Sequence, residues 1–124
     1  MSVDWRRWAR RHYRLDGHRV LVKLTGQRKQ LVWCEERGSG SLRLWSTVLG
    51  PASAKELRIG HLHAWSRNRL SELVAFRMDE KGRMIGEIML PPAGITEDEW
   101  VLCVLVLARS CDRAEYVLSG ADAT

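Results

Sequence analysis

The histidines and cysteines of this chain are not spaced for metal binding or for catalysis. His61 and His63 are two residues apart, which would place them on different sides of a helix. The three cysteines, Cys34, Cys103 and Cys111, form no C-x-x-C pair. The sequence also has no H-E-x-x-H, G-x-S-x-G, G-x-x-x-x-G-K-[S/T] or G-x-G-x-x-G motif. We therefore expect a protein that is not an enzyme and that holds no metal and no cofactor.

Arginine offers a different chemistry, because its guanidinium group pairs with phosphates. The first segment spaces Trp5 and Trp8 as on one side of a helix. The rest of that helix would carry five arginines, Arg6, Arg7, Arg10, Arg11 and Arg14. Residues 1–50 hold eleven basic and four acidic residues, whereas residues 51–124 hold nine and eleven. A nucleic-acid-associated accessory protein is therefore one hypothesis, but we favour a solvated outer face on an arginine-rich protein.

Tryptophan is the third residue type that suggests a binding role. The chain has six tryptophans, and this residue is enriched where proteins meet. In the run SLRLWSTVL, strand alternation puts Trp45 on one face with Arg43 and a threonine, while leucines and a valine take the other. We predict that Trp45 is an exposed aromatic on a partner-binding surface. Arg43, Trp33 and Trp65 are the further candidates for that surface.

The elements that must position these residues follow from hydrophobic periodicity and turn signals. We expect eight elements in the order α-β-β-β-α-β-β-α. The first helix covers about 4–14, and a second one starts at the capping box Ser53–Glu56 and runs to about 65. Strands are expected at 19–25, 30–36, 41–49, 70–78 and 83–90. The fold class is therefore α+β, a twisted antiparallel sheet of five strands with packed helices, in a single domain over residues 1–124.

The last helix has the clearest start signal and the most apolar surface. Thr96 and Glu99 form a capping box, and the run WVLCVLVLA follows at once. This run is too short to span a membrane and too apolar for a solvated surface. Its cover is either the protein's own sheet, a second copy or a client. The candidate residues for a dimer or partner interface are Trp100, Val101, Val104, Leu105 and Ala108.

Two further features of the sequence indicate where the protein works. No stretch of about 18 apolar residues is present, so we expect no membrane span. The N-terminal MSVDWRRWARRHYR has no apolar core of a secretion signal, and the cysteines do not form a disulfide framework. We expect a cytoplasmic protein with reduced thiols.

The stretch from about residue 64 to 122 contains Trp65, Arg67-Asn68, Leu73-Val74, Phe76, Asp79, Gly82-Arg83, Gly86-Glu87, Pro91, Gly94, Thr96, Glu99, Cys111-Asp112-Arg113 and Glu115-Tyr116. At these positions it resembles the YbjN-type proteins, which are similar in fold to bacterial type III secretion chaperones. The resemblance implies a twisted five-stranded antiparallel sheet with packed helices, no enzymatic activity, a homodimer and the capture of extended client segments.

Together, the residues and the resemblance favour a bacterial, chaperone-like module that binds a peptide or a protein partner without catalysis. Two alternatives stay open. One is the nucleic-acid-associated accessory protein that uses the arginine-rich first helix. The other is an obligate subunit of a larger bacterial assembly, in which the apolar last helix forms the interface.

Overall fold

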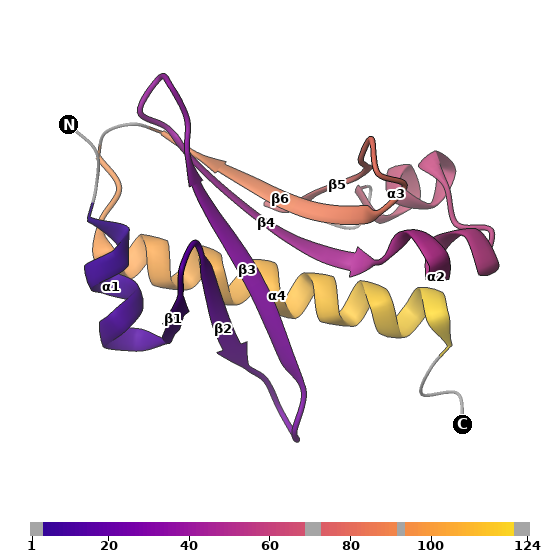
Figure 1. Ribbon diagram of the computed structural model, residues 1–124, viewed down its shortest axis with the longest axis horizontal. Coiled ribbons are helices and arrows are strands. Elements are labelled where there is room, and N and C mark those ends of the chain that lie inside the picture. The colour runs from indigo at the N-terminus through magenta and orange to yellow at the C-terminus, as the bar shows by residue number, and fades with distance from the viewer. Residues whose placement is uncertain (1–3, 69–72, 92–93, 121–124) are drawn as a thin grey trace.

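The computed structural model describes residues 4–68, 73–91 and 94–120, and its fold is α+β. The sheet is antiparallel, with six strands in the order β1-β2-β3-β4-β6-β5. Helix α4 runs along one side of it, with α1 at one end of the molecule and α2 and α3 at the other (Figure 1). The elements are α1 (Trp5–His12), β1 (Arg14–Asp16), β2 (Arg19–Lys23), β3 (Lys29–Glu36), β4 (Leu42–Leu49), α2 (Pro51–Glu56), α3 (His61–Asn68), β5 (Ala75–Met78), β6 (Met84–Leu90) and α4 (Glu97–Ser119).

The predicted α+β class is confirmed, and the structure adds one short strand to the predicted five. Helix α1 ends at His12, and the chain then turns back as β1, which pairs with β2. Gly17 lies in the tight turn that joins β1 to β2, where its φ of 63° is a backbone conformation that favours glycine. Arg14 had been predicted on the first helix, but it begins β1 instead.

The single helix expected at 53–65 is two helices. Helix α2 begins at Pro51 after the N-cap Gly50, so the predicted capping box at Ser53 is wrong. It ends where Arg58 adopts a left-handed φ of 57° and the Ile59 amide donates to the Ala54 carbonyl. This closing pattern is a Schellman motif, normally made with glycine. The break turns the chain into α3.

The last helix is covered mainly by its own chain. Its inner side packs on β3, β4 and β6, where the side chains of Val104, Leu107 and Ala108 are completely buried. The approach is close: a Cβ atom added to Gly86 on β6 would lie 2.7 Å from the Cys111 sulfur. Among the described residues, no helix combines the length and the apolar character needed to cross a membrane.

The N-terminal end of α4 is covered by α1. Trp5, Trp8 and Tyr13 surround Trp100 with ring centroids at 6.4, 6.0 and 6.1 Å, and the Tyr13 hydroxyl donates to the Val101 carbonyl at 2.8 Å. The predicted capping box of Thr96 and Glu99 starts this helix.

The predicted interface of the last helix therefore needs correction. Trp100, Val104 and Ala108 are fully buried within one chain, so they form core rather than a contact surface. The physical reason is that the sheet and α1 cover different sides of the apolar run. Val101 and Leu105 are partly buried against the same core, and Leu102, which had not been singled out, is the most exposed apolar residue of α4, at 58%.

Candidate functional site

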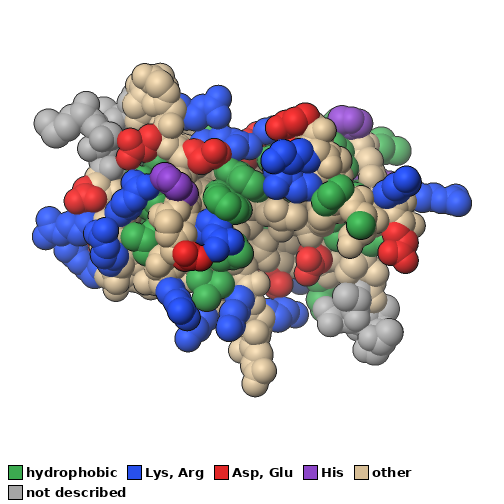
Figure 2. Space-filling model, in the orientation of Figure 1, with side chains coloured by type: hydrophobic (Ala, Val, Ile, Leu, Met, Phe, Trp, Pro, Cys, Tyr) green, Lys and Arg blue, Asp and Glu red, His purple; other side chains and the backbone are tan. Residues whose placement is uncertain are grey.

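The face of the sheet that points away from α4 carries the predicted partner-binding residues of β3 and β4; we call it the open face. On β4, the residues Leu42, Leu44 and Val48 join the core, and Arg43 and Trp45 lie on the open face, as the alternation predicts. Figure 2 views β2 and β3 from this side and shows hydrophobic side chains between groups of basic ones. The open face includes Arg19, Leu21, Leu31, Trp33, Glu35, Arg43, Trp45, Thr47, Arg77, Ile85, Glu87 and Met89.

A stacked pair of tryptophans occupies the middle of the open face. The strand register places Trp33 directly opposite Trp45, and their rings are nearly parallel, 6° apart, with centroids at 5.3 Å. The Arg19 guanidinium lies over the Trp33 ring at 5.3 Å, and that of Arg83 lies over Trp45 at 4.9 Å. Such stacks and cation–π contacts stabilise aromatic rings that no helix covers.

This packing corrects one prediction. Trp45 had been expected to be an exposed aromatic, but it is only 8% exposed. Trp33 and the guanidinium groups of Arg43 and Arg83 cover its ring, and its indole N–H donates to a Glu35 carboxylate oxygen at 2.7 Å. Trp33 is the member of the pair that remains partly accessible.

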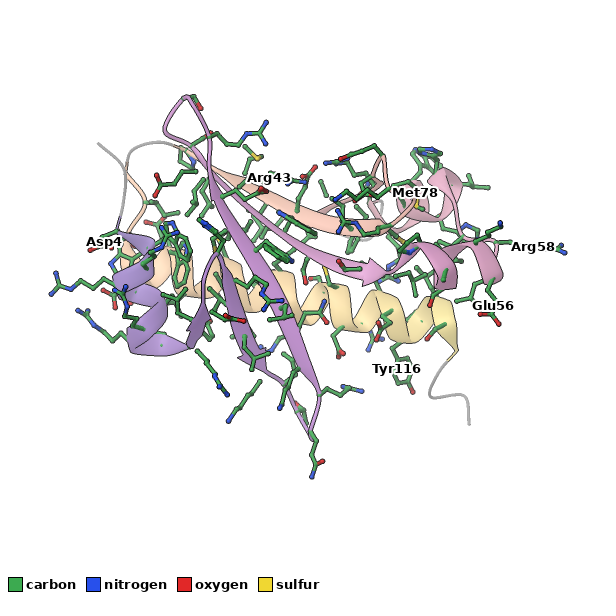
Figure 3. All side chains as sticks on the ribbon, viewed as in Figure 1. Asp4, Arg43, Glu56, Arg58, Met78 and Tyr116 are labelled. Atoms are coloured by element: carbon green, nitrogen blue, oxygen red, sulfur yellow. The ribbon has the colours of Figure 1, made fainter. Side chains whose placement is uncertain are left out.

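Ion pairs connect four strands across the open face. Arg43 donates to Glu35 on β3 at 2.7 Å and to Glu87 on β6 at 2.9 Å, and Arg77 on β5 donates to the other oxygen of Glu87 at 2.8 Å. Burial alone would raise the pKa of Glu87, but the hydrogen bonds from Arg77 and Arg43 prevail and lower it. Glu87 therefore stays ionised. Figure 3 shows Arg43 where β3, β4 and β6 converge.

In the described part of the chain, three surface depressions adjoin the tryptophan pair. One of about 410 Å³ reaches from Trp33 to Arg6 and His18 beside α1. A second, of about 380 Å³, is lined by Trp33 and by Leu21 and Leu31 among others. The third, of about 370 Å³, lies over Trp45 and is lined mainly by charged side chains, four of them arginines. Trp33 thus lines two depressions of mixed polarity, and Trp45 lines the charged one.

Trp65 is not part of this arrangement. It is 56% exposed on α3, which packs on the edge strand β5, and it lines none of the three depressions.

The Asn68 amide at the end of α3 bonds to both the N–H and the carbonyl of Phe76, so it occupies the free edge of β5.

The arginine-rich first helix has the predicted amphipathic form, with Trp5 and Ala9 buried. Arg6 and Arg11 are engaged within the chain: Arg6 contacts a His18 ring nitrogen at 2.9 Å, and Arg11 pairs with Glu97 at 2.8 Å. Arg7, Arg10 and Arg14 are exposed. The prediction that the first helix binds nucleic acid therefore rests on Arg7 and Arg10 on α1, with Arg14 nearby on β1.

The described residues offer little for metal or nucleophile chemistry. They contain no group of three or more His, Cys, Asp or Glu side chains placed to hold a metal ion. Burial raises the pKa of Cys111 to about 12 and also raises that of Cys34, so both remain neutral thiols rather than thiolate nucleophiles. The cysteines of the described structure are free.

No protein-family model and no curated protein matches this sequence, so the resemblance to YbjN-type proteins stays a prediction.

Sequence reasoning missed Glu35, Glu87, Arg19 and Arg83, which hold the tryptophan pair and Arg43 in place. Alternation along β3 and β6 could have put the two glutamates on the open face, but their pairing depends on a strand register that the sequence does not specify.

Proposed function

We propose that this protein is a non-catalytic, cytoplasmic binding module that holds an extended segment of a partner protein on its open face. The observation that carries the proposal is the Trp33–Trp45 stack, fixed between guanidinium groups and bordered by three depressions. Tryptophan and arginine are among the residues most enriched where binding energy concentrates. Because the pair is already ordered by the chain's own contacts, a partner would not have to order it.

The same stack favours a protein over a nucleic acid as the occupant of this face. Proteins bind single strands by stacking bases on accessible aromatic faces. Here Trp45 covers one side of Trp33 and Arg19 approaches it from the neighbouring strand on the other side. The carboxylates of Glu35 and Glu87 lie beside the pair and would repel phosphates.

Selection from a random peptide library displayed on phage tests this function without a known partner. We expect peptides that bind the intact chain with micromolar affinity and lose at least about tenfold with Trp33→Ala, the truncation of one central aromatic. Trp65→Ala is the matched control, because it removes an exposed tryptophan outside the three depressions. Circular dichroism verifies that both variants fold. Peptides that depend on Trp65 and not on Trp33, or no enriched peptide, would contradict the proposal.

The exposed part of α4 favours a second candidate, self-association as a homodimer or assembly with another subunit. Leu102 is exposed beside the partly buried Val101 and Leu105, and exposed apolar patches mark association sites. If a second copy covers this side, Leu102→Glu converts a dimer into a folded monomer in sedimentation velocity. An intact chain that is monomeric at high micromolar concentration would exclude the homodimer.

A further inference from the structure

The depression over Trp45 contains more hydrogen-bond donors than its own acceptors can satisfy. Four arginines line it, Arg37, Arg43, Arg77 and Arg83, against three acidic residues, Asp79, Glu80 and Glu87. Each guanidinium has five N–H donors and no acceptor. The question is whether the carboxylates of the depression use up these donors.

The hydrogen bonds of the acidic residues show that they do not. The two oxygens of Glu87 accept from the Nε atoms of Arg43 and Arg77. Asp79 accepts from the backbone amides of Lys81 and Arg83 and from Arg83 Nε. Within the described part of the chain, the hydrogen bonds found for Arg77 and Arg83 thus engage Nε and leave the terminal nitrogens without a protein acceptor.

These donors are also held in place before any ligand arrives. The side chain of Arg43 is only 13% exposed and bridges two glutamates. Arg83 is fixed by Asp79 and lies over the Trp45 ring, and Arg77 is tied to Glu87. Ordered arginines lose less conformational entropy when they bind a carboxylate than free ones do.

We propose that this depression receives the carboxylate of an aspartate or glutamate in the bound segment of the partner. The inference rests on the proposed function and names the chemistry of the segment: an acidic residue with apolar neighbours. The acid would accept from the terminal nitrogens of Arg77 and Arg83 and from Arg37. Apolar residues next to the acid in the segment would contact Met89, which is exposed at the rim. They would also contact Leu31 and Trp33 in the second depression.

A singly charged carboxylate suits the depression better than a phosphate group does. Glu80 and Glu87 remain part of its lining, and their repulsion grows with the charge of the ligand. A carboxylate also matches the two parallel N–H donors of a guanidinium. A phosphorylated segment or a nucleic acid would need more positive charge than the net single charge that four arginines and three acids provide.

The experiment sorts the peptides selected from the random library by their dependence on Trp33. Among the dependent ones, we expect enrichment of Asp and Glu, and a selected peptide should weaken at least about tenfold when its acid becomes Gln or Asn. With Arg37→Ala plus Arg77→Ala in the protein, the same peptide change should have a much smaller effect, because the interaction partner is already gone. Arg113→Ala, exposed on α4, is the control.

The possible failures are distinguishable. Trp33-dependent peptides without acidic enrichment would overturn this inference and leave the binding function in place. An absence of Trp33-dependent peptides would overturn the binding function itself. Tighter binding of a phosphoserine version of the peptide, or of a single-stranded oligonucleotide competing at the same arginines, would replace the acidic segment by a phosphate ligand. If the double variant does not fold, Arg37→Ala alone tests the same loss of peptide binding. Arg37 is exposed in the β3–β4 turn, so its truncation should leave the fold intact.

Discussion

The two faces of strand β4 bury apolar side chains in different ways. Toward α4, Leu44 and Val48 are packed under a helix in a core of aliphatic and aromatic groups. Toward the open face, Trp45 is nearly as buried, but its cover consists of a second tryptophan and of arginine side chains held by carboxylates. One face is closed by a helix, and the other by side chains that ion pairs hold in place.

This difference suggests how one small sheet can be both stable and available for binding. A helix-covered face has close-packed neighbours, so changes there cost several kcal/mol. A face covered by long side chains keeps its apolar groups from water while leaving charged groups at the surface. Substitutions on the two faces should therefore differ in how much they change the free energy of unfolding and in whether they also change the contacts at the surface.

A charge on the covered side of α4 should have the largest effect. Val104→Glu buries a carboxylate in a site with no exposure, and we expect a loss of more than about 4 kcal/mol or failure to fold. Leu102→Glu, on the exposed side of the same helix, should change the free energy of unfolding of the monomer by less than about 0.5 kcal/mol. Urea unfolding followed by circular dichroism measures both. Equal effects would mean that α4 is not oriented as described.

The next largest effect should come from adding a methyl group where β6 lies closest to α4. In Gly86→Ala, the new methyl group meets the Cys111 sulfur at 2.7 Å, and such overpacking costs about 1–3 kcal/mol. Cys111→Ala removes that sulfur, so the double variant should lose less than the sum of the single losses. Gly38→Ala is the control, because no heavy atom lies within 4 Å of its Cβ position. Additive losses would contradict the close approach.

On the open face, the two arginines that share Glu87 should not be equivalent. Arg43→Ala removes two charge-assisted bonds and part of the cover of Trp45, and we expect a loss of about 1–3 kcal/mol. Arg77 is 44% exposed and makes one such pair, so Arg77→Ala should cost less than about 1 kcal/mol. The far-ultraviolet circular dichroism of the stacked tryptophans should weaken in Arg43→Ala only. A larger loss with Arg77→Ala would overturn this ranking.

The contrast between the faces also separates what the sequence could predict from what it could not. Alternation along β4 correctly assigned Arg43 and Trp45 to the face opposite the leucines, because side chains alternate in any strand. The exposure of Trp45 was predicted wrongly, since it depends on the cross-strand partner Trp33 and on Arg83, which reaches Trp45 from the turn between β5 and β6.

The same limit applies to the helices. The start of α4 was predicted correctly because Thr96 and Glu99 act within one turn. The break between α2 and α3 was missed because it relies on Arg58 in a left-handed conformation that usually belongs to glycine. Similarly, periodicity showed that the apolar run of α4 needed a cover. It could not show that α1 covers Trp100, because this packing depends on contacts between segments far apart in the sequence.

An effect smaller than that of Arg43→Ala should come from acid, at the turn that orients Arg83. Burial by itself would raise the pKa of the Asp79 carboxyl, but the Arg83 backbone amide, the Arg83 guanidinium and the Lys81 amide all donate to it, so the net effect lowers its pKa. A carboxyl with a lowered pKa in the folded state stabilises the fold above the unfolded pKa, near 3.8, and loses that contribution as the pH falls.

The stability difference between the intact chain and Asp79→Asn should therefore be about 1 kcal/mol near pH 7 and shrink toward pH 2, measured by urea unfolding across the pH range. Glu80→Gln, at the exposed position next to it, is the matched control and should change stability by less than Asp79→Asn does at neutral pH. A difference that grows as the pH falls would contradict the sign. Because Arg83 covers Trp45 from this turn, Asp79→Asn should also change the circular dichroism of the stacked tryptophans. Such a change would show that the turn affects the open face as well as local stability.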